Sequence, residues 1–167
     1  MKQSRFKTAL VALALPSIVL TPAALARMQQ GFSPEPGLLH LTAAEPVARI
    51  VNVRELGARG DGVADDSAAI QMAIDAAGKN ATIKFPAGVY LVSNLRVKGR
   101  SGLVFTGEGR RSVLKQKAGA ERIATFEGSS DIVITQLGFD ANGIKSYGGL
   151  AFYAAKRVRI ENNWFWD

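Results

Sequence analysis

The chain has 167 residues, no cysteine, a single histidine and a formal net charge of +7. This length allows one domain with a sizeable core, and 47% hydrophobic and 21% charged residues are ordinary for a globular protein. The missing cysteines exclude disulfides, thiolate metal ligands and cysteine nucleophiles. The only histidine, His40, lies in a Pro-rich stretch away from every patterned segment, so neither a zinc site made of several histidines nor a histidine-based triad is available.

The N-terminus has the pattern of an export signal. Basic residues within the first seven positions precede an apolar run over residues 8–20, and Ala24-Leu25-Ala26 offers a small-x-small cleavage motif. The run is shorter than the roughly 20 residues of a spanning helix. Residues 1–26 are therefore predicted to be a signal peptide cut after Ala26. The mature chain would be secreted or periplasmic, without a stable membrane span.

Residues 27–47 contain three prolines and no sustained period, which indicates a leader or linker. Patterned sequence begins near residue 48 and continues to residue 167. Its first segment, residues 50–53, is predicted to be a strand with Val51 and Val53 on one side.

The stretch GARGDGVADDSAAIQMAIDAA, residues 57–77, invites three ligand-loop readings. Its glycine intervals do not fit a dinucleotide fingerprint, it lacks the Gly-Lys-Ser/Thr of a phosphate loop, and its spacing does not fit an EF-hand. A helix over residues 66–77 fits better, with Asp65 or Asp66 at its N-terminus. The apolar stripe of this helix is Ile70, Ala73, Ile74 and Ala77.

Short strands of alternating pattern follow residue 80. They are marked by these pairs: Ile83/Phe85, Tyr90/Val92, Leu95/Val97, Leu103/Phe105, Ile132/Ile134, Leu137/Phe139 and Val158/Ile160. The segments 131–139 and 157–165 align at an offset of 26, and residues 103–105 precede 132–134 by 29. A period of 20–30 residues with several strands per unit predicts a β-solenoid, the alternative being an ordinary sandwich.

Residues 51–77, together with IKFPAGVYLVS at residues 83–93, resemble the N-terminal segment of the pectate-lyase-like superfamily, of the rhamnogalacturonase/epimerase type. Ser67 stands where that family more often has threonine. The resemblance implies an all-β, right-handed parallel β-helix whose N-terminal end is covered by a short α-helix. The Gly/Asp stretch would then be a turn and a helix start, with a structural role. Residues 48–167 would form the N-terminal part of this domain.

The same resemblance implies carbohydrate chemistry, because members cleave polyuronates by elimination, hydrolyse galacturonan-type chains or epimerise uronates. Fold alone does not choose among these reactions. The catalytic signatures of the galacturonases and of the alginate epimerases have no match after residue 80, so no catalytic residue is carried over. A Ca²⁺ requirement is implied by the resemblance only, and the residues themselves indicate no metal site or other cofactor.

Candidate substrate-binding residues are Asp140, Lys145, Trp164 and Trp166. Asp140 and Lys145 lie on one expected loop, where the alternative for Asp140 is an Asx turn. Trp164, Trp166 and Tyr153 are aromatic residues able to stack on sugar rings. Phe165 is predicted to face the core, which leaves the two tryptophans outward. The neighbouring pair Asn162-Asn163 is expected at a structural corner of the solenoid.

Between residues 96 and 117, seven basic residues accompany one acidic residue, Glu108. This excess is either a solvated face or a surface for an anionic polymer. For an exported protein the partner would be an acidic polysaccharide rather than nucleic acid.

The sequence thus predicts the first coils, about four, of an exported β-helix that acts on an acidic polysaccharide as lyase, hydrolase or epimerase. Because patterned sequence runs up to Asp167, we expect a truncated chain, inactive as it stands, that self-associates through an uncapped C-terminal edge. The alternative is a non-catalytic surface or adhesive β-helix that binds glycans.

Overall fold

The structure, a computed structural model, describes residues 49–144 and 149–167. These residues belong to one compact unit, Glu45–Asp167. The predicted signal peptide and leader, residues 1–47, lie outside the described residues.

The described residues form short strands, a single α-helix and two 3-10 turns. The strands are β1 (Arg49–Asn52), β2 (Asp61–Asp65), β3 (Ala81–Lys84), β4 (Gly88–Val92), β5 (Leu95–Lys98), β6 (Val104–Thr106), β7 (Ser112–Gln116), β8 (Ala124–Glu127), β9 (Ser130–Thr135), β10 (Gly138–Asp140), β11 (Leu150–Tyr153), β12 (Lys156–Glu161) and β13 (Trp164–Trp166). The helix is α2 (Ser67–Ala76), and the 3-10 turns are η1 (Val53–Leu56) and η2 (Gly109–Arg111).

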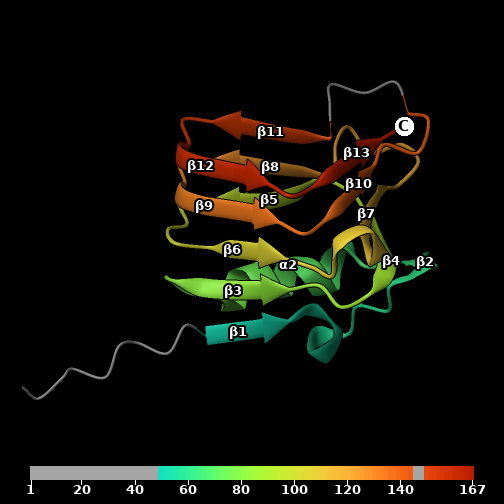
Figure 1. Ribbon diagram of the computed structural model, residues 1–167, viewed down its shortest axis with the longest axis horizontal. Coiled ribbons are helices and arrows are strands. Elements are labelled where there is room, and N and C mark those ends of the chain that lie inside the picture. Colours follow the sequence, from blue (N-terminus) through green and yellow to red (C-terminus); the bar gives the residue numbers. More distant parts are fainter. Residues whose placement is uncertain (1–48, 145–148) are drawn as a thin grey trace, which may run out of the picture. The chain divides into compact units, whose positions relative to one another are not determined.

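Parallel pairing arranges the strands into three sheets that wind around a common core (Figure 1). Sheet A has the order β1-β3-β6-β9-β12, sheet B the order β13-β10-β7-β4-β2, and sheet C the order β11-β8-β5. The chain visits sheets A, B and C in turn and then begins the next coil. This is the parallel β-helix that the sequence predicted, and successive coils rise by about 4.8 Å, the spacing of paired strands.

The repeat predicted from the sequence corresponds to the register in which strands of successive coils pair. Val158 pairs with Ile132 and Phe165 with Phe139, each at the offset of 26 residues. Val104 pairs with Val133 at the offset of 29. Because partners in neighbouring coils point the same way, inward residues build apolar columns, as Leu95, Ala124 and Leu150 do in sheet C.

Corners of the solenoid repeat as well. Gln136 and Asn162 both have positive φ, 56°, at the bend from sheet A to sheet B. The side chain of the next residue, Asn163, accepts a hydrogen bond from the Leu137 amide at 3.0 Å and donates one to the Ile134 carbonyl at 2.8 Å. These bonds supply partners for backbone groups where the ladder is interrupted. The predicted structural role of the asparagine corner is confirmed.

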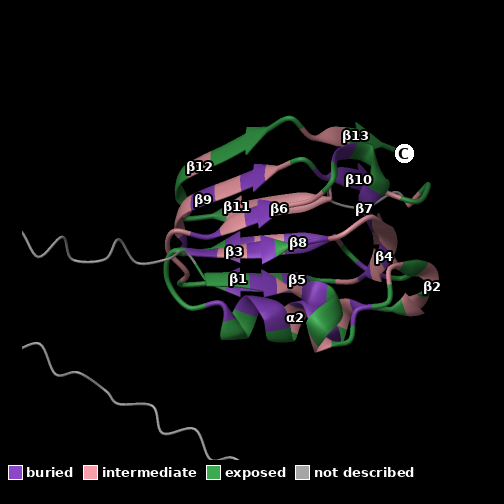
Figure 2. Cartoon of the chain, turned by 60° about the horizontal axis from the view of Figure 1, so that its bottom comes forward, coloured by how far each residue is buried: buried purple, intermediate pink, exposed green. Residues whose placement is uncertain are grey.

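The helix α2 takes the place of a sheet C strand in the first coil, between β2 and β3. Its predicted apolar stripe is buried, with Ile70 and Ala73 at 0% exposure and Ile74 at 1%. Figure 2 shows this buried side facing the strands, while the opposite side of the helix is exposed. The helix therefore covers the apolar end of the solenoid, as the resemblance implied.

A second, polar stripe on α2 runs along β5, the edge strand of sheet C. The Gln71 amide donates to the Arg96 carbonyl at 2.9 Å and its oxygen accepts from the Arg96 amide at 2.9 Å. One turn earlier Ser67 Oγ accepts from the Ser93 amide at 2.9 Å, and one turn later Asp75 pairs with Arg100 at 2.9 Å. Gln71 thus makes the two hydrogen bonds that a neighbouring strand would make, which satisfies the edge.

The start of the helix differs in detail from the prediction. Asp65 accepts from the Ser67 amide at 3.0 Å, but the Asp66 carboxylate turns back to accept from the amides of Arg59 at 2.7 Å and Gly60 at 3.0 Å. The Asp61 carboxylate also binds backbone amides, but those two and three residues further along the chain. The aspartates therefore hold the loop and the helix start, which is the expected structural role. The sequence analysis did not foresee that residues 61–65 form β2, paired with β4.

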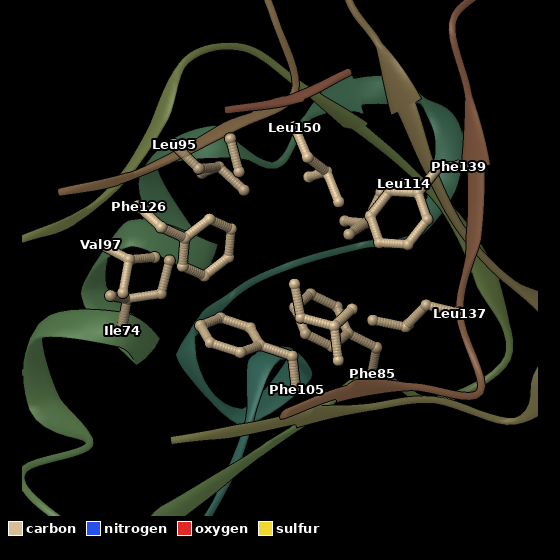
Figure 3. A pocket seen from close by; sticks show the side chains of 12 residues that line it. Ile74, Phe85, Leu95, Val97, Phe105, Leu114, Phe126, Leu137, Phe139 and Leu150 are labelled. Atoms are coloured by element: carbon tan, nitrogen blue, oxygen red, sulfur yellow. The ribbon is translucent and has the colours of Figure 1, made fainter. Parts of the chain in front are cut away.

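The core carries a small apolar cavity of about 20 Å³ (Figure 3). That is room for one water molecule, but the lining side chains offer it no polar partner, so the cavity is dry. Ala124 lines it between Leu95 and Leu150, and Ile74 of the covering helix lines it too.

We expect opposite effects from two changes at this cavity. Ala124→Val fills the void and raises the free energy of unfolding by about 0.5–1 kcal/mol, whereas Ile74→Ala enlarges it and lowers that free energy by about 2–4 kcal/mol. Urea unfolding of both variants measures the two shifts. A loss of stability in Ala124→Val would show that the surrounding side chains leave no room for two more carbons.

An ion pair ties the helix start to a later coil. Lys117, which follows β7, lies 2.6 Å from Asp65, and its ammonium, together with Ser67, lowers the pKa of Asp65 to about 2. The Asp65 side chain is 41% exposed, so solvent screens much of this interaction. Because the folded-state pKa is depressed, the stabilisation is present above about pH 4 and is lost as the pH falls through about 2.

Asp65→Asn is expected to lower the free energy of unfolding by about 1 kcal/mol at neutral pH. The difference from the natural chain shrinks as the pH falls from about 4 to about 2, since both then carry a neutral group. Urea titrations across that range measure it. Lys117→Gln serves as the matched variant, because its effect should not add to that of Asp65→Asn. A difference that does not change with pH would contradict the assignment.

Candidate functional site

Asp140 lies at the end of β10 and is engaged within the protein. Its carboxylate pairs with Lys115 at 3.3 Å and accepts a hydrogen bond from the Asn142 amide at 2.7 Å. The second contact is the Asx turn that the sequence analysis gave as the alternative. Lys145, the other predicted loop residue, lies outside the described residues.

Trp164 and Trp166 lie on the outer side of sheet B, as predicted. Phe165, between them, stacks on the buried Phe139 at 5.0 Å and 13°, which confirms that it points toward the core column, although 60% of it is exposed. Asp140 and Trp166 are register partners, so the structure brings three of the predicted residues together on one face.

The basic segment from residue 96 to 117 does not form one patch. Winding of the chain distributes these residues over different sheets. Five of them lie beside carboxylates, in these ion pairs: Lys98 with Glu127, Arg100 with Asp75, Arg111 with Glu108, Lys115 with Asp140 and Lys117 with Asp65. Within the described residues, Arg96 and Arg110 make no such pair. Within this segment, only the surroundings of these two arginines therefore fit the predicted surface for an anionic polymer.

A shallow groove crosses the outer face of sheet C at Arg96. Alternation in β5 points Leu95 and Val97 inward, which places Arg96 and Lys98 outside. Thr125 and Glu127 of β8 line the same groove, as do Arg122 and Tyr153. Two residues of this groove are already indicated by the sequence, Tyr153 as a ring able to stack on sugars and Arg96 as part of the basic segment, and the alternation LRVK at residues 95–98 turns Arg96 outward. Arg122 is not singled out by the sequence.

Arg122 and Tyr153 form a fixed pair at the groove. The guanidinium donates to the phenol oxygen at 2.9 Å and its Cζ lies 5.9 Å from the ring centroid. The backbone of Arg122 is held by Asn94, whose amide donates to the Arg122 carbonyl at 2.9 Å and whose side-chain oxygen accepts from the Arg122 amide at 3.2 Å. An exposed aromatic ring and a guanidinium are thereby presented side by side.

The backbone of Arg96 is held by the covering helix. Its backbone amide and carbonyl are both bound by Gln71, so the covering helix fixes the strand that presents it. The groove therefore offers two guanidinium groups, from Arg96 and Arg122, beside the ring of Tyr153. Guanidinium groups bind carboxylates with two parallel hydrogen bonds, and aromatic faces suit the apolar faces of sugars.

The described residues contain no cluster of three or more histidine, cysteine, aspartate or glutamate side chains. They therefore offer no such group of side chains to the Ca²⁺ ion that the resemblance allows. Nor does any helix among them have the length and hydrophobicity to span a membrane.

Residues 50–149 match the family model described as rhamnogalacturonase A/epimerase, pectate lyase-like. Among curated relatives, the mannuronan C5-epimerase AlgE1 of Azotobacter vinelandii is 36% identical over 54% of this chain and 8% of its own length. The alginate lyase 7 of the same organism is 37% identical over 54% of this chain and 12% of its own length. This chain thus spans a small part of such relatives.

Solved structures agree with the fold. The A-module of the Azotobacter vinelandii mannuronan C-5 epimerase AlgE4 superposes with a TM-score of 0.56 at 31% identity, covering 67% of this chain and 37% of that one. ORF18 of Geobacillus virus E2 superposes with a TM-score of 0.60 at 26% identity, covering 68% and 25%. With its parallel coils, its covering helix and the match over residues 50–149, this chain belongs to the rhamnogalacturonase A/epimerase, pectate lyase-like family.

Proposed function

We propose that this chain binds an acidic polysaccharide along the outer face of sheet C, as part of a protein that modifies that polymer. The observation that carries the proposal is the groove itself, in which Arg96 and Arg122 flank the exposed ring of Tyr153. The relatives support it, because their names give mannuronan and alginate as the polymers on which they act.

Geometry favours a chain of uronate units over a single sugar. Arg96 lies on β5, Arg122 immediately before β8, and Tyr153 on β11, so the three groups come from successive coils. Coils rise by about 4.8 Å, which is close to the length of one sugar unit. A polymer that crosses the strands would therefore meet a new set of side chains with each unit.

The reaction class remains elimination, hydrolysis or epimerisation. Epimerisation and elimination on a uronate begin by removing the proton next to its carboxylate, and a guanidinium that neutralises the carboxylate makes this proton easier to remove. Arg96 and Arg122 are suited to that supporting role. Among the described residues two carboxylates line the groove, Glu121 and Glu127, and Glu127 is already paired with Lys98. We therefore assign binding to these coils and leave turnover to the test below.

The alternative is a surface or adhesive β-helix that binds glycans without changing them. The Arg122–Tyr153 pair would serve binding alone equally well. Turnover separates the two: a new unsaturated uronate, a shortened polymer or a changed epimer ratio after incubation indicates an enzyme.

Binding is tested with a matched pair of double variants. Arg96→Gln/Arg122→Gln is expected to weaken retention by alginate in affinity electrophoresis by roughly a hundredfold or more, because each lost guanidinium contact with a carboxylate contributes about 1.5–3 kcal/mol. Lys84→Gln/Arg159→Gln removes the same charge from the outer face of sheet A and should bind like the natural chain. Equal weakening by both pairs would show that only net charge matters and would contradict the groove.

Export is the second part of the proposal, together with the domain boundaries at residues 26 and 47. N-terminal sequencing of the mature protein is expected to begin at Arg27. A mature chain that retains Met1 or Lys2 would contradict the signal peptide. Continuation of the chain past Asp167, and self-association through the last coil, likewise stay predictions.

A further inference from the structure

A second surface on this protein lies on sheet B, away from the sheet C strands. It consists of Arg110, Trp164, Phe165 and Trp166, which line an open hollow. We call it the tryptophan surface. The groove proposed above uses none of these residues.

Both indole rings lie against glycines of the preceding coils, and for Trp166 the absence of a side chain is required. A Cβ on Gly138 would lie 2.5 Å from Trp166 Cη2, so the ring of Trp166 lies across a strand position that has no side chain. Trp164 similarly lies over Gly109, where a Cβ would be 3.5 Å from its ring. The rings are therefore supported from below, and Trp166 keeps 40% of its surface exposed.

A cation completes this surface. The Arg110 guanidinium carbon lies 5.6 Å from the Trp164 ring centroid, within the range of a cation–π contact. Unlike Arg111, its neighbour in the same turn, which pairs with Glu108 at 3.0 Å, Arg110 makes no carboxylate pair within the described residues. The Lys115–Asp140 pair lies beside Trp166, since Asp140 and Trp166 are register partners.

From this combination we propose that the tryptophan surface is a second carbohydrate-binding site, whose ligand is an acidic sugar. A pyranose ring would stack on Trp166 by its apolar face, its carboxylate would reach Arg110, and its hydroxyls would meet the Lys115–Asp140 pair. The choice of an acidic over a neutral sugar depends on Arg110. The identity of the polymer rests on the proposed function, but the presence of the site does not.

The chain carries its own reporter for this site, because Trp164 and Trp166 are its two tryptophans. Titration with mannuronate and guluronate oligosaccharides is expected to change tryptophan emission saturably, whereas neutral oligosaccharides of equal length leave it unchanged at the same concentration. Arg110→Gln should weaken the response roughly tenfold. Arg111→Gln is the matched control and should respond like the natural chain, because it removes the same charge from the same turn.

The sheet C variant Arg96→Gln/Arg122→Gln separates the two proposals. A retained emission response in that variant supports an independent second site. A response that disappears with it would show that the tryptophans only sense binding at sheet C, and would overturn the inference. If the natural chain gives no emission response but is still retained by alginate, the second site fails while the proposed function stands.

Light scattering tests the competing occupant, a second copy of the chain. Emission that changes with protein concentration alone, together with the mass of a dimer that Arg110→Gln or Trp166→Ala abolishes, would make this surface an interface between copies and would overturn the sugar site. A mass that does not change with protein concentration, or a dimer that both variants retain, supports the sugar, because association through the open strand edge of the last coil does not use these side chains.

Discussion

Everything in this fold depends on closing the first coil. A β-solenoid leaves two features exposed at its end, an apolar core and the unpaired groups of its edge strands, and different sides of α2 cover the core and the edge of sheet C. Ile70 and Ile74 close the core, where burial of each contributes roughly 1.5–3 kcal/mol. Gln71 meets the edge of β5 with the same two hydrogen bonds that a strand would supply. A short helix thereby replaces a strand of sheet C in the first coil, and the next coils stack on a first coil whose core is already covered.

Stacking then decides where functional groups can lie. Since partners in successive coils share a direction, a side chain that alternation turns outward is repeated along the axis as a column. Arg96, Thr125 and Ala151 follow one another in this way on sheet C, with Arg122 and Tyr153 beside them. Such columns suit a polymer better than a small molecule, because their repeat resembles that of the ligand. On sheet B the same stacking places Gly138 beneath the ring of Trp166, so that this face presents aromatic rings.

Ion pairing decides which of the basic residues keep an unpaired charge, and the amino-acid composition alone does not show this. Seven lie between residues 96 and 117, yet five of these lie beside carboxylates, one of them in the same turn and the others elsewhere along the chain, and surface pairs of this kind contribute little to stability. Their effect is to remove charge from most of the surface. Of the seven, Arg96 and Arg110 have no such pair in the described residues, so each keeps a free positive charge on its face, Arg96 beside Tyr153 and Arg110 beside Trp164.

The amino-acid sequence by itself determined the covering helix, the strand alternation and the offset of 26 residues, because helical stripes, period-two patterns and stacking repeats are local or periodic properties of a chain. It also indicated that Phe165 faces inward and the tryptophans outward. It could not show that the basic segment is divided among sheets, that Asp66 turns back to Arg59, or that Arg122 meets Tyr153, 31 residues later. The Arg122–Tyr153 contact joins different coils, and the Asp66–Arg59 contact closes a loop within the first coil. They depend on the lengths of the turns, which only the tertiary structure decides.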